Sequence, residues 1–177
     1  RASVKAGGLD RAAYTELAEL GLAGLYVPEE HGGMGMGPVE AMVVLEELGR
    51  GIVLEPLSQA LVAGGILAGY APEDVKAAWL PRIASGEVLV VLAHQERGAR
   101  WRLDQCGTHA ALSDQGWVLT GTKGVVPAAD QADAFLVPAV AAGKQALFLV
   151  ERGASGVTTT GYLTQDGSRA GELRLSA

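Results

Sequence analysis

The residues of this sequence best suited to ligand chemistry are three arginines around one tryptophan: Arg97, Arg100, Trp101 and Arg102. A guanidinium group can hold a phosphate or a carboxylate through paired hydrogen bonds, and it can stack on a flat ring. The segment therefore predicts an anion-binding loop. The same residues also fit a solvated loop in which Trp101 folds back onto the core, and the sequence leaves both interpretations open.

A histidine stands just before this segment. The apolar run over residues 88–93 is typical of a strand buried on both faces, and His94 follows it directly. A strand end is a common place for ligand contacts. His94 is therefore a candidate contact residue, with a purely structural role as the alternative.

Other reactive residue types lack the spacing that their chemistry requires. The glycines of residues 32–37 do not follow the GxGxxG spacing of dinucleotide binding, and a helix connector with positive φ angles is favoured instead. Cys106 has no Lys or His beside it to activate a thiolate, and as a single cysteine it predicts no internal disulfide. The three scattered histidines predict no metal site.

Length and composition predict a folded protein. The chain has 177 residues, of which 49% are hydrophobic and 19% are charged, and this excludes intrinsic disorder. A net charge of −6 argues against binding to nucleic acid. The uncharged stretch over residues 56–72 is shorter than the ~20 apolar residues of a spanning helix, so no membrane contact is expected. The single cysteine fits a reducing compartment, and we expect the cytoplasm.

The candidate residues need elements to position them, and the apolar spacing changes near Gly86. Before Gly86 the spacing is helical, with Asp10 as an N-cap, Gly21 as a stop and Pro38 at the start of a later helix. We expect helices over residues 10–20, 38–49, 57–70 and 72–86.

After Gly86, short apolar runs alternate with turn residues, which is typical of strands. We expect strands over residues 88–93, 108–112, 117–120, 135–140, 145–151, 156–160 and 172–175. Pro138 predicts an edge position for its strand, because proline cannot donate to a neighbouring strand. Helices followed by strands predict an α+β fold, with a helical domain over residues 1–86 and a β-domain over residues 87–177.

Several spaced motifs resemble those of the acyl-CoA dehydrogenase family. Residues 20–33 (LGLAGLYVPEEHGG) are similar to its LGLxGLxxPEExGG stretch, residues 80–87 (LPRIASGE) to its LPxIASGE, and residues 116–123 (GWVLTGTK) to its GYxLNGxK hairpin. The motifs stand in the family's order and span essentially the whole chain. Shorter stretches, residues 37–42, 53–56 and 165–170, most resemble the small subunit of pimeloyl-CoA dehydrogenase and its heteromeric relatives.

The resemblance implies an N-terminal all-helical domain, incomplete at its start, followed by an antiparallel β-barrel-like middle domain. The family's C-terminal four-helix domain, which carries the catalytic glutamate, is expected to be absent from this chain, so no catalytic residue is assigned and this stretch alone is expected to be inactive. The implied cofactor is FAD, and the implied reaction is α,β-dehydrogenation of an acyl-CoA thioester with hydride transfer to FAD. The implied partners are the acyl-CoA substrate, an electron-transfer partner, and a homo- or hetero-oligomer with a larger acyl-CoA dehydrogenase subunit.

The resemblance also implies positions for ligand contacts. Contacts to the flavin are expected from six residues: Leu92, His94, Gln95, Val125, Val126 and Pro127. Contacts to the substrate are expected from Arg100 and Trp101, which stand where the family's TEPxxGSD motif has its Gly-Ser pair. Glu96 matches the acid of that motif, which is a supporting position and not the catalytic base.

Departures from the family's motifs leave an alternative function open. Val125 and Pro127 replace the Trp and Thr of the family's WIT motif, so this segment offers the flavin neither a stacking ring nor a threonine hydroxyl. The alternative is a non-catalytic small subunit that completes the flavin and substrate site of a larger partner. A flavin oxidase or hydroxylase with the same fold is a further alternative.

Overall fold

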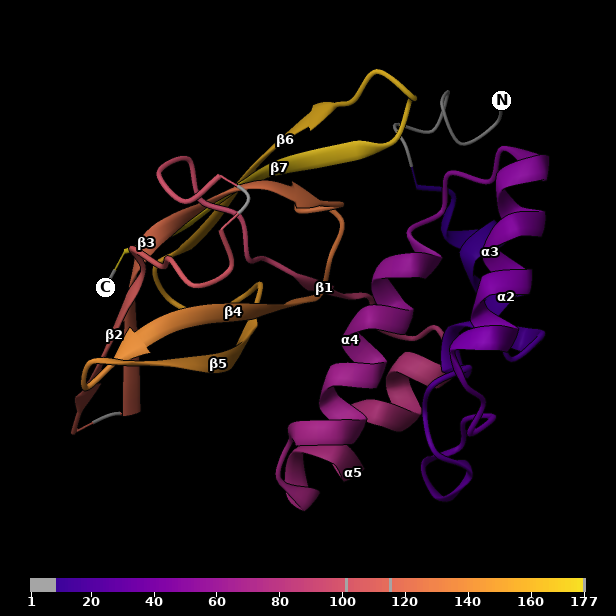
Figure 1. The fold of residues 1–177 in the computed structure, drawn as a ribbon, viewed down its shortest axis with the longest axis horizontal. Helices are drawn as coiled ribbons and strands as arrows, with labels where there is room; N and C mark the ends of the chain where they lie inside the picture. The colour runs from indigo at the N-terminus through magenta and orange to yellow at the C-terminus, as the bar shows by residue number, and fades with distance from the viewer. Residues whose placement is uncertain (1–8, 101, 115, 177) are drawn as a thin grey trace. The chain divides into compact units, whose positions relative to one another are not determined.

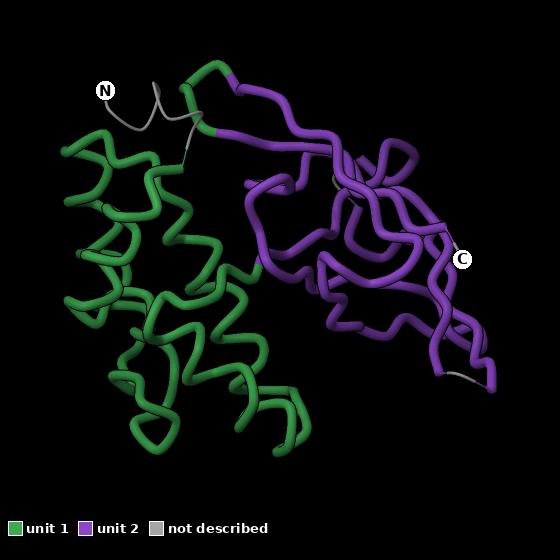
Figure 2. The backbone as a smooth tube through the Cα atoms, turned by 180° about the vertical axis from the view of Figure 1, so that it is seen from behind, with its two compact units in different colours: residues 1–90, 165–168 green, residues 91–164, 169–177 purple. Residues whose placement is uncertain are grey.

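The structure, a computed structural model, describes residues 9–100, 102–114 and 116–176. It divides into two compact units (Figure 2). The first unit contains the chain up to Val90 together with Gln165–Ser168, and the second contains Val91–Thr164 and the chain from Arg169 onward. Helices build the first unit and strands build the second, so the predicted α+β class is confirmed. The predicted domain boundary between residues 86 and 87 stays a prediction.

The first unit contains four α-helices and two 3-10 turns within the described residues (Figure 1). They are α2 (Arg11–Glu19), α3 (Pro38–Gly51), α4 (Leu57–Tyr70) and α5 (Glu73–Ala84), with 3-10 turns at Leu22–Gly24 and Glu29–His31. The four predicted helices are confirmed, with ends that differ by at most two residues. In the described ranges, no helix combines the length and the apolar character needed to cross a membrane.

Local chemistry sets where these helices begin and end. The Asp10 carboxylate accepts hydrogen bonds from the N–H groups of Ala12 at 3.0 Å and Ala13 at 3.3 Å, as an N-cap does. Gly21 follows α2 with a φ of 83°, a left-handed conformation that glycine adopts without strain. Pro38 occupies the first turn of α3, where its missing N–H would have had no helical partner. The sequence predicted all three of these roles.

The glycine-rich segment before α3 is a connector held by backbone hydrogen bonds. The N–H of Met34 donates to the Gly24 carbonyl at 3.0 Å, and the N–H of Gly35 donates to the Val27 carbonyl at 2.8 Å. A Cβ atom at Gly33 would lie only 2.1 Å from the Val27 carbonyl oxygen, so only glycine fits this close approach. The segment is therefore a fixed connector, as predicted, and not a nucleotide-binding loop.

Among the described residues, seven strands form the sheet of the second unit (Figure 1). They are β1 (Val90–Leu92), β2 (His109–Ser113), β3 (Gly116–Pro127), β4 (Ala134–Ala141), β5 (Lys144–Glu151), β6 (Val157–Leu163) and β7 (Arg169–Leu175). Their order is β1-β4-β2-β3-β7-β6, and β5 pairs with β4. The pairs β2–β3, β3–β7, β4–β5 and β6–β7 are antiparallel, in line with the antiparallel middle domain that the resemblance implied. β2 also meets β4 in a short parallel pairing.

The prediction that Pro138 lies on an edge strand is wrong. β4 pairs with β5 on one side, and on its other side it pairs with both β1 and β2. The N–H of Ala93 donates to the Leu136 carbonyl at 2.9 Å, and the N–H of Val140 donates to the Thr108 carbonyl at 2.8 Å. Because alternate residues of a strand face the same neighbour, Pro138 faces the gap between these two contacts. Its missing N–H therefore leaves no ladder bond unmade.

Apolar side chains fill the core of each unit. Tyr14 and Leu57 are fully buried in the first unit, and Phe135 and Leu173 are fully buried in the second. Lys123 is buried just as completely, with 0% of its surface exposed. A buried ammonium group requires a partner of opposite charge, so Lys123 marks a polar centre inside the second unit.

Candidate functional site

The segment that follows β1 lies against an irregular part of β3. The Gln95 carbonyl accepts a hydrogen bond from the Gly124 N–H at 2.9 Å. The register of β3 against β7 shifts between Lys123 and Val126, which is the signature of a β-bulge. We call this meeting point of the β1 end and the bulge the β1–β3 joint. It brings together the two segments on which flavin contacts were predicted.

Val125 stands at the bulge in a strained conformation. Its φ is 50°, in the left-handed region that a β-branched residue rarely adopts and that costs about 1–3 kcal/mol. The Val125 side chain is 55% exposed, whereas Val126 is only 1% exposed. Residues strained in this way gather at functional sites, so the bulge is a candidate place for ligand contact.

Glu96 is the centre of a polar cluster. Its Oε1 accepts hydrogen bonds from Lys123 Nζ at 2.6 Å, from the Thr108 hydroxyl at 2.7 Å and from the Thr108 N–H at 3.1 Å. Its Oε2 accepts a hydrogen bond from the Gly107 N–H at 2.6 Å. Cys106 Sγ lies 3.5 Å from Oε1 and 3.6 Å from Lys123 Nζ. We call these five residues the Glu96 cluster, and it ties the β1 end, the segment before β2 and strand β3 together.

The Glu96 cluster holds its carboxylate in the ionised state. Burial raises the pKa of the Glu96 carboxyl, but the hydrogen bonds from Lys123, Thr108 and Gly107 outweigh burial and lower the pKa to about 2, from an ordinary value of 4.5. Glu96 is therefore charged at neutral pH, and donors occupy both of its oxygens. A carboxylate in this state is a poor proton acceptor, which suits a supporting role and not that of a base.

His94 lies between β1 and Gln95 and has an unusual imidazole. Its Nδ1 is buried and has no hydrogen-bond partner among the described residues. Desolvation, and after it the positive charge of Lys123, lowers the pKa of His94 below the ordinary value of 6.5. The ring is therefore neutral at neutral pH.

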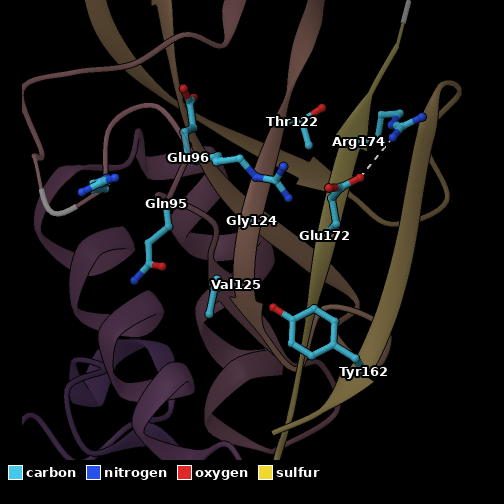
Figure 3. Close-up of a pocket in the computed structure, with 10 residues that line it drawn as sticks. Gln95, Glu96, Thr122, Gly124, Val125, Tyr162, Glu172 and Arg174 are labelled. Atoms are coloured by element: carbon cyan, nitrogen blue, oxygen red, sulfur yellow. Dashed lines mark hydrogen bonds and ion pairs between the residues drawn. The ribbon is translucent and has the colours of Figure 1, made fainter.

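An open pocket of about 770 Å³ lies at the β1–β3 joint (Figure 3). Its volume falls within the range of about 300–1,000 Å³ that is usual for small-molecule sites. Its lining comes from the loop after β1 and from β3, β6 and β7: Gln95, Glu96, Arg97, Arg100, Thr122, Gly124, Val125, Tyr162, Glu172 and Arg174. In Figure 3 the Tyr162 hydroxyl points toward Val125, and Glu172 pairs with Arg174 at 3.1 Å.

The structure gathers some of the predicted contact residues at this pocket. Gln95, Val125 and Arg100 line it. The other four described candidates do not appear in its lining: Leu92, His94, Val126 and Pro127. The remaining candidate, Trp101, lies outside the described residues. Within the described part of the chain, no three metal-ligating side chains come together.

Sequence reasoning missed the part of the pocket that β6 and β7 supply. Thr122 of β3 pairs with Arg174 of β7, and Glu172 lies two residues before Arg174, so both β7 side chains share one face of the sheet. Tyr162 comes from β6, the next strand in the sheet. Nothing in the sequence states which strand pairs with β3, so only a prediction of strand order would have found these residues.

Comparison with known proteins shows which protein family this chain resembles. Residues 2–87 match the acyl-CoA dehydrogenase N-terminal domain. The chain is 33% identical over 169 residues to acyl-CoA dehydrogenase FadE27 of Mycobacterium tuberculosis, an alignment that covers 94% of this chain and 44% of FadE27.

Two solved structures extend the likeness to both units. The ChsE4-ChsE5 complex from Mycobacterium tuberculosis matches with a TM-score of 0.85 and 32% identity, covering 95% of this chain and 45% of the matched chain. An acyl-CoA dehydrogenase complexed with FAD from Bacillus anthracis matches with a TM-score of 0.78 and 28% identity, covering 94% of this chain and 30% of the matched chain. The chain spans less than half the length of each of these three relatives. By sequence motifs and by fold, the chain belongs to the acyl-CoA dehydrogenase family.

Proposed function

We propose that this chain is part of an acyl-CoA dehydrogenase flavoprotein subunit, which oxidises the α,β bond of an acyl-CoA thioester and transfers hydride to FAD. The observation that carries the proposal is the β1–β3 joint, where Gln95 and Gly124 are hydrogen-bonded at 2.9 Å beside a pocket of about 770 Å³. The proposal includes a homo- or hetero-oligomer with a larger subunit, an electron-transfer partner and a cytoplasmic location.

The residues at the joint fit a flat group with a polar edge, such as the flavin of FAD. The side-chain amide of Gln95 offers hydrogen-bonding atoms to the pocket, and Val125 offers an apolar surface. A ligand site usually combines a mainly apolar lining with a few placed polar groups. We propose that Gln95 and Val125, which line the pocket, hold the flavin. The four predicted contact residues that do not line the pocket then support them by packing: Leu92, His94, Val126 and Pro127.

The chain's own contribution to the reaction is to orient ligands and to set their electrostatic surroundings. When bound, FAD would supply the redox chemistry by accepting the hydride. Glu96 does not remove the substrate proton, because its carboxylate is ionised with a pKa of about 2 and both oxygens accept hydrogen bonds inside the Glu96 cluster. We therefore assign no catalytic base to this chain.

A second candidate function is a non-catalytic small subunit that completes the flavin and substrate site of a larger partner. Val125 and Pro127 favour this candidate, because the joint then offers neither an aromatic ring nor a hydroxyl to the flavin. The likeness to a chain of the ChsE4-ChsE5 complex also favours it. Three short stretches resemble the small subunit of pimeloyl-CoA dehydrogenase, and this resemblance also favours the second candidate.

The visible absorbance of flavin tests both candidates, measured on the full-length protein purified alone and together with its larger subunit. Flavin bound by the protein alone and bleached by an acyl-CoA supports the first candidate and rejects the second. Flavin bound only in the presence of the larger subunit supports the second. Absence of flavin from both preparations rejects both.

A matched pair of substitutions tests whether the flavin binds at the β1–β3 joint. Val125→Asp places a charge on the proposed flavin surface and should abolish flavin binding. Leu112→Asp places the same charge on β2 at a side chain that is 70% exposed and does not line the pocket, so it should leave flavin binding unchanged. Equal effects of the two substitutions would reject the joint as the flavin site.

A further inference from the structure

Two arginines of the pocket have no oppositely charged partner among the residues that the structure describes. The acidic residues of the pocket are both paired, Glu172 with Arg174 at 3.1 Å and Glu96 with a buried lysine at 2.6 Å. Arg97 and Arg100 line the same pocket, and neither forms an ion pair with another described residue. Within the described part of the chain, the pocket therefore keeps two positive charges without an ion pair, although the net charge of the chain is −6.

The loop that carries these arginines has a fixed backbone. The Glu96 carbonyl accepts hydrogen bonds from the N–H of Ala99 at 3.1 Å and from the N–H of Arg100 at 3.0 Å. Ala99 is only 7% exposed, and the Glu96 side chain is held within the Glu96 cluster. Side chains that start from a fixed backbone lose less conformational freedom on binding, so the loop is prepared to hold a ligand.

Arg100 adopts a backbone conformation that favours glycine. Its φ is 51°, in the left-handed region. The motif TEPxxGSD, which this loop resembles, has glycine at this position. An arginine here strains the backbone, and such strain commonly accompanies a functional role of the residue. The presence of an arginine side chain at a position that favours glycine therefore needs a functional explanation.

We propose that Arg97 and Arg100 bind an oxyanion carried by the ligand of this pocket, either a phosphate or a carboxylate. Both groups accept paired, charge-assisted hydrogen bonds from guanidinium. The resembling motif has proline and glycine at these two positions, so the contact is a property of this chain. The proposal refines the pocket of the proposed function, but it does not require that a flavin binds there.

Two small probes, inorganic pyrophosphate and glutarate, test the proposal by calorimetric titration of the full chain at low ionic strength, where attraction between exposed charges is strongest. Arg97→Ala and Arg100→Gly each remove one guanidinium from the pocket. The matched control, Arg102→Ala, removes a guanidinium from the same loop. Arg102 pairs with Asp104 at 2.6 Å and does not line the pocket.

We expect at least one probe to bind, and each pocket variant to weaken that binding about tenfold, as loss of a charged hydrogen-bond donor does. The control should change it by less than about twofold. Tighter binding of pyrophosphate assigns the site to a phosphate, and tighter binding of glutarate assigns it to a carboxylate. Failure of both probes to bind, or equal weakening by Arg102→Ala, would overturn the proposal.

Riboflavin, which carries the flavin ring without a phosphate, separates this proposal from the proposed function. Pocket variants that bind riboflavin normally but lose the small probe support both proposals. If neither riboflavin nor FAD binds, with or without the larger subunit, while the probe binds and the pocket variants lose it, the proposed function fails and the oxyanion site stands.

Discussion

Glu96 and Arg97 are neighbours in the sequence, yet their charges have opposite surroundings. The Glu96 carboxylate accepts hydrogen bonds from Lys123, Thr108 and Gly107, and its side chain is 11% exposed. Arg97 is exposed, lines the pocket and has no ion-pair partner among the described residues. The first charge is used to join strands, whereas the second remains available to a ligand.

This difference shows how a short loop can have a fixed backbone and still present a charged side chain to a ligand. A buried charge with every hydrogen bond made fixes the backbone around it, and breaking such an arrangement is costly. An exposed charge without a partner adds little to stability, but it retains its full capacity to bind. Substitutions in the Glu96 cluster should therefore change stability, and substitutions at Arg97 or Arg100 should change binding.

Removal of the Glu96 carboxylate should have the largest effect. Glu96→Ala leaves the fully buried ammonium group of Lys123 without a counter-charge, and we expect a loss of about 3–5 kcal/mol in the free energy of unfolding, measured in urea. The control, Glu87→Ala, removes one partner of the exposed ion pair with Arg82 and should cost less than about 1 kcal/mol. Similar losses in both variants would contradict a structural role for the Glu96 cluster.

A larger side chain at Gly121 of β3 would crowd the Glu96 cluster, and it should have the next largest effect on stability. A Cβ atom at Gly121 would lie 2.5 Å from the Thr108 Oγ1 and 2.8 Å from the Thr108 Cα. Gly121→Ala should therefore displace Thr108, which donates to Glu96, and cost about 1–3 kcal/mol of stability in thermal unfolding. Gly124→Ala is the control, because nothing lies within 4 Å of its Cβ position. A stable Gly121→Ala protein would show that the close approach of Thr108 is not required.

A smaller effect should appear in acid. Folding lowers the pKa of Glu96 from 4.5 to about 2, so the ionised carboxylate stabilises the fold above pH 4.5, and this contribution is lost as the pH falls from 4.5 toward 2. Glu96→Gln cannot titrate. It should be less stable than the wild type at pH 7, and it should lose less stability over that acidic range. Melting temperatures measured from pH 7 to pH 3 check this, and parallel curves for the two proteins would contradict it.

The smallest effect should be a gain in stability when Arg100, which lines the pocket, is replaced by glycine. Arg100→Gly relieves the left-handed strain at a φ of 51°, and we expect about 1 kcal/mol of stabilisation, seen as a higher melting temperature. Arg100→Ala removes the same guanidinium but keeps a Cβ atom, so it should bring no such gain. If both variants melt at the same temperature, backbone strain at this residue is not significant.

The helices could be predicted because their signals are local. Asp10 caps α2 through N–H groups two and three residues away, and Pro38 needs only its own ring to begin α3. The Glu96 cluster could not be predicted in this way. Glu96 and Lys123 are 27 positions apart in the sequence, and only the packing of the sheet brings them together. Cys106 likewise has no reactive neighbour in sequence, but it lies 3.6 Å from Lys123 in space.

The candidate site was predictable only in part, for the same reason. The resemblance placed Gln95 and Val125 near a ligand, and both line the pocket. Tyr162 and Arg174 reach the pocket through the pairing of β3 with β7 and of β7 with β6, and local sequence does not encode strand order. Pro138 was misplaced because the edge rule assumes one continuous neighbour along each side of a strand.

The position of Pro138 also restricts how the sheet can assemble. In the observed register His109 is opposite Val140, and the Val140 N–H donates to the Thr108 carbonyl at 2.8 Å. If β2 slid by two residues along β4, the same carbonyl would face Pro138, which has no hydrogen to offer. A sheet in this shifted register would lack that hydrogen bond. The Pro138 ring therefore favours one alignment of β2 and β4, although the two strands pair at only two positions.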